Sequence, residues 1–118
     1  MSTSVTTTGL RSIIHPVRDL DRAVALFSVL AGGAPYMHQP YYAGFSIGGH
    51  DVGLDPNGHA RGLTGPTAYW LVDDLEASVA ALVQQGATVT HPISEVGGGR
   101  RVALLHDADG NPIGLAHG

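Results

Sequence analysis

The sequence predicts an α+β fold, in which two tandem βαβββ modules form a cupped, mostly antiparallel sheet with the helices on its outer face. Two observations indicate this fold, and the first is an internal repeat. The segment Val17–Asp21 is echoed by Val72–Glu76, 55 residues further along the chain. The second is a short phrase that follows a glycine twice, as His50–Leu54 and as Asn111–Leu115. A duplicated module accounts for both repeats.

Each module is expected to open with a strand and a helix. Ile13–Val17 and Ala68–Val72 are short apolar runs of the kind that form strands. Asp19 and Asp74 follow them, where an N-cap residue belongs. The apolar positions that then recur with a helical period are Leu20, Ala23, Val24, Phe27 and Leu30 in the first module and Leu75, Val79, Leu82 and Val83 in the second.

Three further strands are expected after each helix. They fall near Ala34–His38, Tyr41–Ile47 and Asp51–Asp55 in the first module, and near Thr88–His91, Arg101–His106 and Pro112–His117 in the second. Glycine-containing turns separate them, and Asp109-Gly110 is a strong hairpin signal. We therefore expect one domain at residues 10–118, with modules at about 10–62 and 63–118. Residues 1–9 are Ser/Thr-rich and are expected to form a disordered lead-in.

The composition excludes several classes of function. The 118 residues carry a net charge of −4 without a basic cluster, which argues against nucleic acid and anionic membranes as partners. The chain contains no cysteine, and all six basic side chains are arginine, so thiolate and lysine chemistry are excluded. No apolar run is long enough to span a bilayer, and the N-terminal residues lack the layout of a signal peptide. We expect a cytoplasmic protein.

Three segments together resemble the vicinal oxygen chelate superfamily, which includes glyoxalase I, extradiol dioxygenases and bleomycin-resistance proteins. They are Pro16–Ala23, Val72–Leu75 and the closing segment Asp107–Ile113, the most specific of the three. The resemblance covers about residues 10–118. It implies the fold predicted above and, in members that use a metal, a divalent ion held by the first and last strands of each module.

The resemblance places the four metal-ligand positions at Ser12, Gly53, Thr67 and Gly114. None of these residues is a useful ligand for a divalent transition metal, which prefers imidazole, carboxylate or thiolate groups. We therefore expect no metal and no other cofactor. The alternative is a relocated metal site made of histidines, for which His15, His106 and His117 are the candidates.

Strand alternation predicts which residues face the cavity. With glycine at two former ligand positions, we expect an enlarged pocket with a polar rim that suits a flat organic molecule. Asp51 and Asp55 either favour a cationic ligand or are solvated turn residues, which is the preferred interpretation, and Trp70 is expected in the core. The predicted ligand-binding residues are Ser12, Ile14, Tyr42, Asp51, Gly53, Thr67, Tyr69, Arg101 and Gly114.

Three functions compete at this point. The leading hypothesis is a metal-independent protein that binds a small organic molecule, resembling the drug-sequestering bleomycin-resistance proteins. The second is an enzyme of the same family, a lyase, isomerase or dioxygenase with a relocated metal. The third is an accessory module that binds protein, which an apolar surface patch without a sizeable pocket would favour. The resemblance also implies a homodimer.

Overall fold

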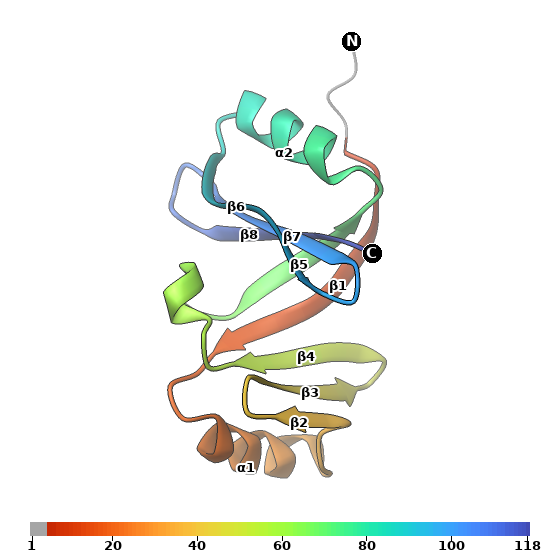
Figure 1. The fold of residues 1–118 in the computed structure, drawn as a ribbon, viewed down its shortest axis with the longest axis vertical. Coiled ribbons are helices and arrows are strands. Elements are labelled where there is room, and N and C mark those ends of the chain that lie inside the picture. The colour runs from red at the N-terminus through yellow and green to blue at the C-terminus, as the bar shows by residue number, and fades with distance from the viewer. Residues whose placement is uncertain (1–4) are drawn as a thin grey trace. The chain divides into compact units, whose positions relative to one another are not determined.

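The computed structural model describes residues 5–118 and confirms the predicted α+β fold (Figure 1). The chain divides into two compact units, which we treat one at a time. The first module is Ser12–Thr67, and the second module is Ala68–Gly118 together with the N-terminal segment as far as Arg11. The boundary lies five residues beyond the predicted one.

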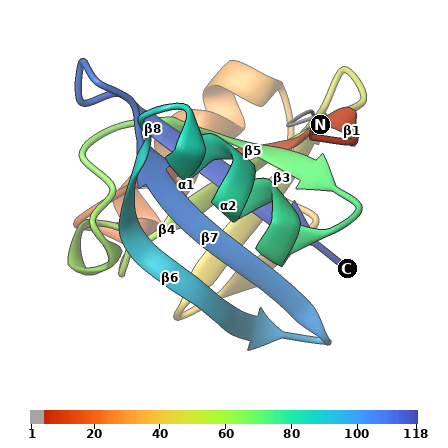
Figure 2. The same cartoon turned by 90° about the horizontal axis from the view of Figure 1, so that it is seen from above.

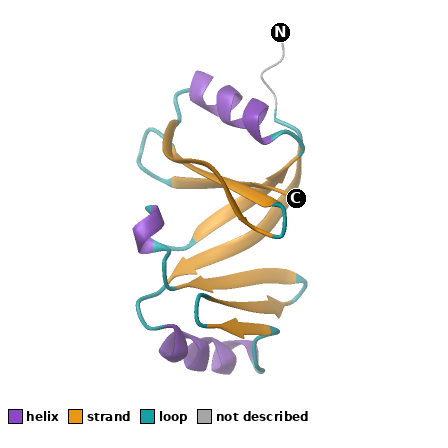
Figure 3. Cartoon of the chain, viewed as in Figure 1, coloured by secondary structure: helices purple, strands orange, loops and turns teal. Residues whose placement is uncertain are grey.

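The first module contains one helix and the strands around it. Its sheet has the order β2-β3-β4-β1, in which β1 runs parallel to β4 and the other neighbours are antiparallel. A 3-10 helix follows β4 (Figure 3), which the sequence patterns did not predict. The elements are β1 (Thr7–Pro16), α1 (Leu20–Ala31), β2 (Met37–Gln39), β3 (Tyr42–Ile47), β4 (His50–Asp55) and η1 (His59–Arg61).

The second module repeats this topology. Its own strands have the order β5-β8-β7-β6, with β5 parallel to β8 and antiparallel pairing elsewhere. Helix α2 covers one face of β6, β7 and β8 (Figure 2). The elements are β5 (Thr67–Val72), α2 (Leu75–Gln84), β6 (Thr88–Gly97), β7 (Arg100–His106) and β8 (Pro112–His117).

Both helices begin where the sequence predicts. The carboxylates of Asp19 and Asp74 accept hydrogen bonds from the backbone N–H groups of Arg22 and Ala77, at 3.0 and 2.9 Å. These bonds satisfy donors that a helix leaves unpaired at its first turn. Helix α1 ends at Gly32, whose φ of 75° is a left-handed conformation that favours glycine.

Each module has a separate hydrophobic core between its helix and its sheet. The first contains Leu20, Val24, Ala43, Phe45 and Leu54, and the second contains Val72, Leu75, Ala103, Leu105 and Leu115. In each module, the apolar side of the helix therefore packs against alternate strand residues, which point to the same face of the sheet.

The structure differs from the prediction at the strand ends. Strand β1 begins at Thr7, so the expected disordered lead-in does not hold for Thr7–Gly9, whereas residues 1–4 lie outside the described part of the chain. Strand β6 runs to Gly97, past the predicted end at His91, and passes through Pro92 with shifts in register. A proline is tolerated there because β6 is the outer strand of its module, where an N–H group need not pair.

The expectation that Trp70 belongs to the core is wrong. Helix α2 packs against β6, β7 and β8, whereas Trp70 lies on β5. Its side chain remains 40% exposed. Strand alternation assigned the correct face of the sheet, but the helix does not cover the whole of that face.

Candidate functional site

The face of the first module that lies away from α1 carries most of the predicted site residues. Ala43, Phe45 and Leu54 point toward the helix and form the core. Alternation therefore places Tyr42 and Gly53 on the opposite face. Contacts within the module confirm this arrangement, because a Cβ atom at Gly53 would lie 2.6 Å from Tyr42 Cζ and 2.7 Å from Ile14 Cδ1. We call this surface the first tyrosine face; it consists of Ser12, Ile14, Tyr36, Tyr42, Gly44, Asp51 and Gly53.

Gly53 does not leave an empty space, which corrects the expectation of an enlarged pocket at this position. The phenol of Tyr42 occupies the place of a side chain, so that a Cβ at Gly53 would overlap its hydroxyl oxygen. Glycine allows this approach because it has no side chain of its own. The position that the resemblance assigns to a metal ligand is thus filled by a tyrosine from the neighbouring strand.

A second tyrosine repeats this relation on the same face. Tyr36 lies over Gly44, where a Cβ would come within 2.7 Å of its Cζ and its hydroxyl oxygen. That hydroxyl group donates a hydrogen bond of 2.7 Å to Asp51. Asp51 pairs in register with Ser12 of the adjacent strand. Ser12 and Asp51 therefore lie side by side at a polar edge of the face, and Tyr36 bonds to Asp51.

Asp55 is neither a solvated turn residue nor a group aimed at a ligand. It is 1% exposed, and its carboxylate forms an ion pair of 2.7 Å with Arg61 of η1. The same carboxylate accepts a hydrogen bond of 2.8 Å from the backbone N–H of Asn57. Asp55 therefore anchors η1 to the end of β4, and the preference for a solvated residue was wrong.

The second module has an equivalent arrangement, which we call the second tyrosine face and define as Tyr69, Leu104 and Gly114. Gly114 pairs with Tyr69 on one side and with Leu104 on the other. A Cβ at Gly114 would lie 2.6 Å from both Cγ and Cδ2 of Tyr69. The second closing-strand glycine is thus also covered by a tyrosine ring.

Arg101 does not share this face, which corrects its assignment to the cavity. Two residues along β7, Ala103 packs into the core under α2, so alternation places Arg101 on the helix side. There the guanidinium donates hydrogen bonds of 2.5 and 3.2 Å to the two carboxylate oxygens of Glu76. These hydrogen bonds and the positive charge lower the pKa of Glu76 to about 2.

The hydroxyl residues of the opening strands are buried at the two expected positions. Ser12 pairs with Asp51 of the adjacent strand, as described above. The hydroxyl group of Thr67 donates a hydrogen bond of 2.9 Å to the carbonyl oxygen of Gly65. Thr67 therefore holds the turn that precedes β5. Neither hydroxyl belongs to the imidazole, carboxylate and thiolate groups that a divalent transition metal prefers.

The histidines serve structural contacts. The ring of His15 packs on Phe27 at 5.0 Å between centroids, and burial lowers the pKa of His15. His106 Nδ1 lies 2.7 Å from Thr90 Oγ1, and His117 Nδ1 lies 2.9 Å from the carbonyl oxygen of Val72. His106 and His117 stand at opposite ends of the β7–β8 pair. Among residues 5–118, no three His, Asp or Glu side chains gather as a metal site requires.

The residues at the four family positions do not fit a metal ion. Gly53 and Gly114 offer no donor atom, and a carboxylate placed there would collide with Tyr42 or Tyr69. Ser12 and Thr67 offer only neutral hydroxyl groups. The disagreement lies in the donor set itself, and we derive no chemistry through a metal at these positions.

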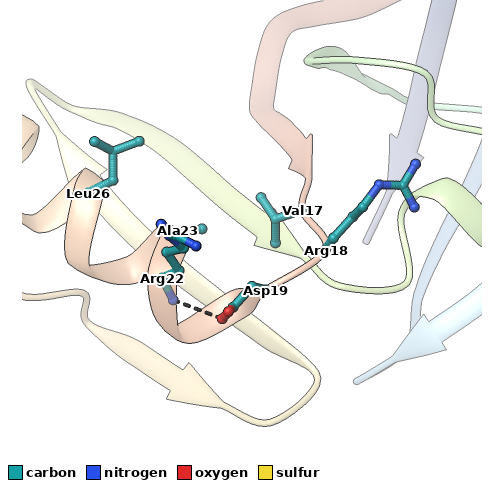
Figure 4. A pocket seen from close by; sticks show the side chains of 6 residues that line it. All are labelled: Val17, Arg18, Asp19, Arg22, Ala23 and Leu26. Carbon is teal, nitrogen blue, oxygen red and sulfur yellow. Dashed lines mark hydrogen bonds between the residues drawn. The ribbon is translucent and has the colours of Figure 1, made fainter.

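A separate hollow lies on the outer side of the first module, beside α1 (Figure 4). Its volume is about 570 Å³, and its wall combines apolar side chains with two arginines. The sequence analysis missed it, because no local pattern shows that the end of β1 and the first turns of α1 leave a hollow between them. We call it the α1 groove; it is lined by Val17, Arg18, Asp19, Arg22, Ala23 and Leu26.

No helix within residues 5–118 combines the length and the apolar character needed to cross a membrane.

Comparison with known proteins bears on the fold. No protein-family model matches this sequence, and no curated protein matches it. Solved structures do match. The chain superimposes on a glyoxalase/bleomycin resistance protein/dioxygenase superfamily member from Vibrio splendidus 12B01 with a TM-score of 0.68 and 16% identity, covering 92% of this chain and 97% of that one.

Two further matches carry other activities in their names. A methylmalonyl-CoA epimerase from Streptomyces coelicolor, in complex with 2-nitronate-propionyl-CoA, gives a TM-score of 0.71 at 19% identity, with 95% of each chain covered. A structure described as an NAD-dependent benzaldehyde dehydrogenase from Legionella pneumophila gives 0.73 at 13% identity, covering 89% of this chain and 96% of that one. The predicted resemblance is therefore confirmed at the level of the fold, and identities this low carry no activity with them.

Proposed function

We propose that this protein binds a small organic molecule without a metal ion, using its two tyrosine faces. The observation that carries the proposal is the pairing of Tyr42 with Gly53 and of Tyr69 with Gly114. At both closing-strand positions where the resemblance places a carboxylate ligand, a phenol ring stands instead. The module keeps the framework of a binding site and replaces coordinating groups by aromatic ones.

The chemistry of the first tyrosine face indicates the kind of ligand. A phenol ring offers flat apolar surface and a hydroxyl group, which suits a ligand with an aromatic or otherwise planar part. At the polar edge, Asp51 supplies a carboxylate that already accepts the Tyr36 hydroxyl at 2.7 Å. A ligand with a hydrogen-bond donor or a positive charge next to its flat part fits these groups best. Sequestration of a drug-like or natural product of this kind is the function we favour.

A thermal-shift screen tests the proposal. A ligand that binds only the folded protein raises the midpoint of unfolding. At a ligand concentration of a hundred times Kd, the free energy of unfolding increases by about 2.7 kcal/mol. The screen should include aromatic and glycosylated natural products, and Zn²⁺, Ni²⁺ and Fe²⁺ as separate additions. We expect organic compounds to raise the midpoint and the metals to leave it unchanged.

Variants then assign the effect to the faces. Tyr42→Ala and Tyr69→Ala should each reduce the shift caused by a hit. Tyr41→Ala is the matched control, because Tyr41 is 59% exposed in the turn before β3 and belongs to neither face. Equal losses in all three variants, or a stoichiometric transition metal in the purified protein, would contradict the proposal.

The enzyme alternative has its own arm in this screen. The Streptomyces coelicolor epimerase of the same fold was solved with a CoA ester bound. Methylmalonyl-CoA is therefore added to the panel, and its conversion is followed by chromatography. Turnover of the ester would replace binding by catalysis as the function. We also propose that the protein is cytoplasmic and forms a homodimer, as the sequence analysis expects.

A further inference from the structure

The outer surface of α1 is apolar where a solvent-facing helix is normally charged. Leu26, Val29 and Leu30 are 68%, 83% and 74% exposed. No charged residue follows Arg22 before the helix ends at Ala31. Arg22, Leu26 and Val29 are four and three residues apart and so share one side of the helix, with Leu30 next to Leu26. We call Leu26, Val29 and Leu30 the α1 ridge.

The second module shows that the fold does not require this surface. At the repeat spacing of 55 residues, the α1 ridge corresponds to Ala81, Gln84 and Gln85. The positions that face the core are apolar in both helices, namely Leu20 with Leu75 and Val24 with Val79. The two helices thus match where they pack and differ where they face outward. An exposed apolar ridge that only one of the two modules carries is typical of an interaction site.

The α1 groove and the α1 ridge share Leu26 and extend from it toward opposite ends of the same helix. The groove lies beside the first turns, and its lining combines the apolar Val17, Ala23 and Leu26 with charged side chains (Figure 4). The ridge occupies the last turns. A surface with a hollow and a projection on either side of one point can pair with itself through a twofold axis, since each copy then fills the hollow of the other.

We propose that a second copy of this chain docks on α1, with the two α1 helices antiparallel and the twofold axis near Leu26. Val29 and Leu30 of each copy enter the α1 groove of the other. Leu26 then contacts Leu26 of the second copy on the axis, and the two α1 ridges together form a continuous apolar contact. Burial of apolar area is the principal driving force of such an association.

Charge at the ends of the helices favours the same arrangement. Among the described residues, neither Arg18 nor Arg22 takes part in an ion pair. In the antiparallel pair, Arg22 approaches the C-terminal end of the other α1, which carries partial negative charge and has no basic residue in its last turn. The nearby carboxylates are engaged, since Asp19 accepts the N–H of Arg22 and Asp21 pairs with His38 at 3.1 Å.

A single cysteine at the proposed axis tests the contact directly. The natural chain has no cysteine, so any disulfide in a Leu26→Cys variant must join two copies. Residues on a twofold axis come close enough for the bond, which needs Cα atoms about 4.4–6.8 Å apart. We expect Leu26→Cys to form a covalent dimer under mild oxidation. Gln84→Cys, at the corresponding surface of α2, is the matched control and should remain largely uncrosslinked.

Measurement of mass in solution completes the test. The unmodified protein should sediment with twice the mass of one chain at micromolar concentration. Leu26→Glu combined with Val29→Glu should raise the dimer dissociation constant by about 100-fold or more, because the two-fold axis doubles the number of buried charges. Gln84→Glu should leave it unchanged. Thermal unfolding and circular dichroism confirm that each variant is folded, since all three positions are exposed or polar.

Two results would overturn the inference. One is a protein that remains monomeric at concentrations up to about 100 µM, because a dimer with a weaker dissociation constant would be too unstable to count as a specific contact. The other is a dimer that persists in the double glutamate variant, which would place the interface elsewhere. The inference deepens the homodimer of the proposed function: a monomer would contradict both, whereas a dimer that persists in the glutamate variant would overturn only the α1 contact. It does not rest on the proposed ligand, so the glutamate variant should keep any thermal shift produced by a compound that binds the tyrosine faces.

Discussion

The two modules of this chain are alike inside and different outside. Both cap their helices with an aspartate, both run their last strand parallel to their first, and both cover the closing-strand glycine with a tyrosine. On the surface they diverge, because α1 exposes Leu26, Val29 and Leu30, whereas the corresponding side of α2 is small or polar. Packing constrains a repeat from within, and the freedom to acquire partners remains on its outer positions.

The glycine and tyrosine pairs also differ in a detail that matters for substitution. At Gly53, the nearest atoms belong to the far ends of flexible side chains, the hydroxyl of Tyr42 and Cδ1 of Ile14. At Gly114, the nearest atoms are Cγ and Cδ2 of Tyr69, at the base of the ring. The end of a side chain moves aside by a small rotation, whereas the base of a ring moves only with its backbone or with a change of rotamer.

The largest expected difference between the modules is at the end of the closing strand. The first module buries Asp55 there, while the second carries Ala116, 61 residues further on. Arg61→Ala should cost about 2–3 kcal/mol in the free energy of unfolding, because it leaves a buried carboxylate without its cation while the N–H of Asn57 still donates to it. Urea unfolding measures the loss. Arg100→Ala, at an exposed arginine outside any ion pair in the described chain, is the control.

The next effect separates the two glycines. Gly114→Ala should cost about 1–3 kcal/mol, because the new methyl group meets the base of the Tyr69 ring. Gly53→Ala should cost less than about 1 kcal/mol, since Tyr42 can turn away and alanine is favoured over glycine in a strand. Neither glycine has the positive φ that would add backbone strain. Thermal unfolding ranks the two variants, and the reverse order would remove the distinction drawn between them.

A double-mutant cycle sharpens that comparison. Tyr42→Phe removes the oxygen atom that a Cβ at Gly53 would overlap. Gly53→Ala should therefore cost less in the Tyr42→Phe background than in the natural chain, with a coupling of about 0.5 kcal/mol or more. Additive effects would mean that the two residues do not meet as the structure shows.

The smallest effect concerns the ion pairs that hold each helix to its sheet. Glu76 bonds to Arg101, and at the corresponding position Asp21 bonds to His38. The pKa of Glu76 is lowered from 4.5 to about 2, so its ionised form stabilises the folded state above pH 4.5, and this contribution disappears as the pH falls toward 2. Exposed ion pairs contribute little, so the difference is small.

Glu76→Gln tests this pH dependence. At pH 7 the variant should melt slightly below the natural protein, and the two melting curves should coincide near pH 2. A difference that grows on acidification would contradict the sign. High salt should narrow the gap at pH 7, because the pair is open to solvent.

The sequence could predict the fold because its signals are local and repeated. The aspartate caps, the helical period of Leu20, Val24 and Phe27, and the turn at Asp109-Gly110 each specify a short segment, and the second module confirms what the first suggests. Strand ends were less predictable. At the start of β1 the Thr7 hydroxyl donates to the carbonyl oxygen of Leu71, 64 residues away, and no local pattern contains such a contact.

The site was predictable as a set of faces but not as a set of contacts. Alternation correctly placed Ile14, Tyr42 and Gly53 on one face. It could not show that Tyr42 fills the space above Gly53, because that depends on a diagonal contact between neighbouring strands. Arg101 was misplaced because its own strand parity was not compared with that of Ala103 and Leu105, and the partner Glu76 lies on a different element.

Strand β1 has a consequence for how this chain could arise or be divided. Residues Ser12–Pro16 of this strand pair with β4. Earlier in the chain, the carbonyl oxygen of Thr6 accepts a hydrogen bond from the N–H of Asp73, and the Thr7 hydroxyl donates one to the carbonyl oxygen of Leu71 on β5. The boundaries of the sequence repeat therefore differ from those of the compact units, because the first half of β1 belongs to the second module. A fragment starting at Ala68 would lack the backbone that completes the edge of β5. Recombination or truncation at the repeat boundary should yield fragments that fold only when residues 5–11 travel with the second half.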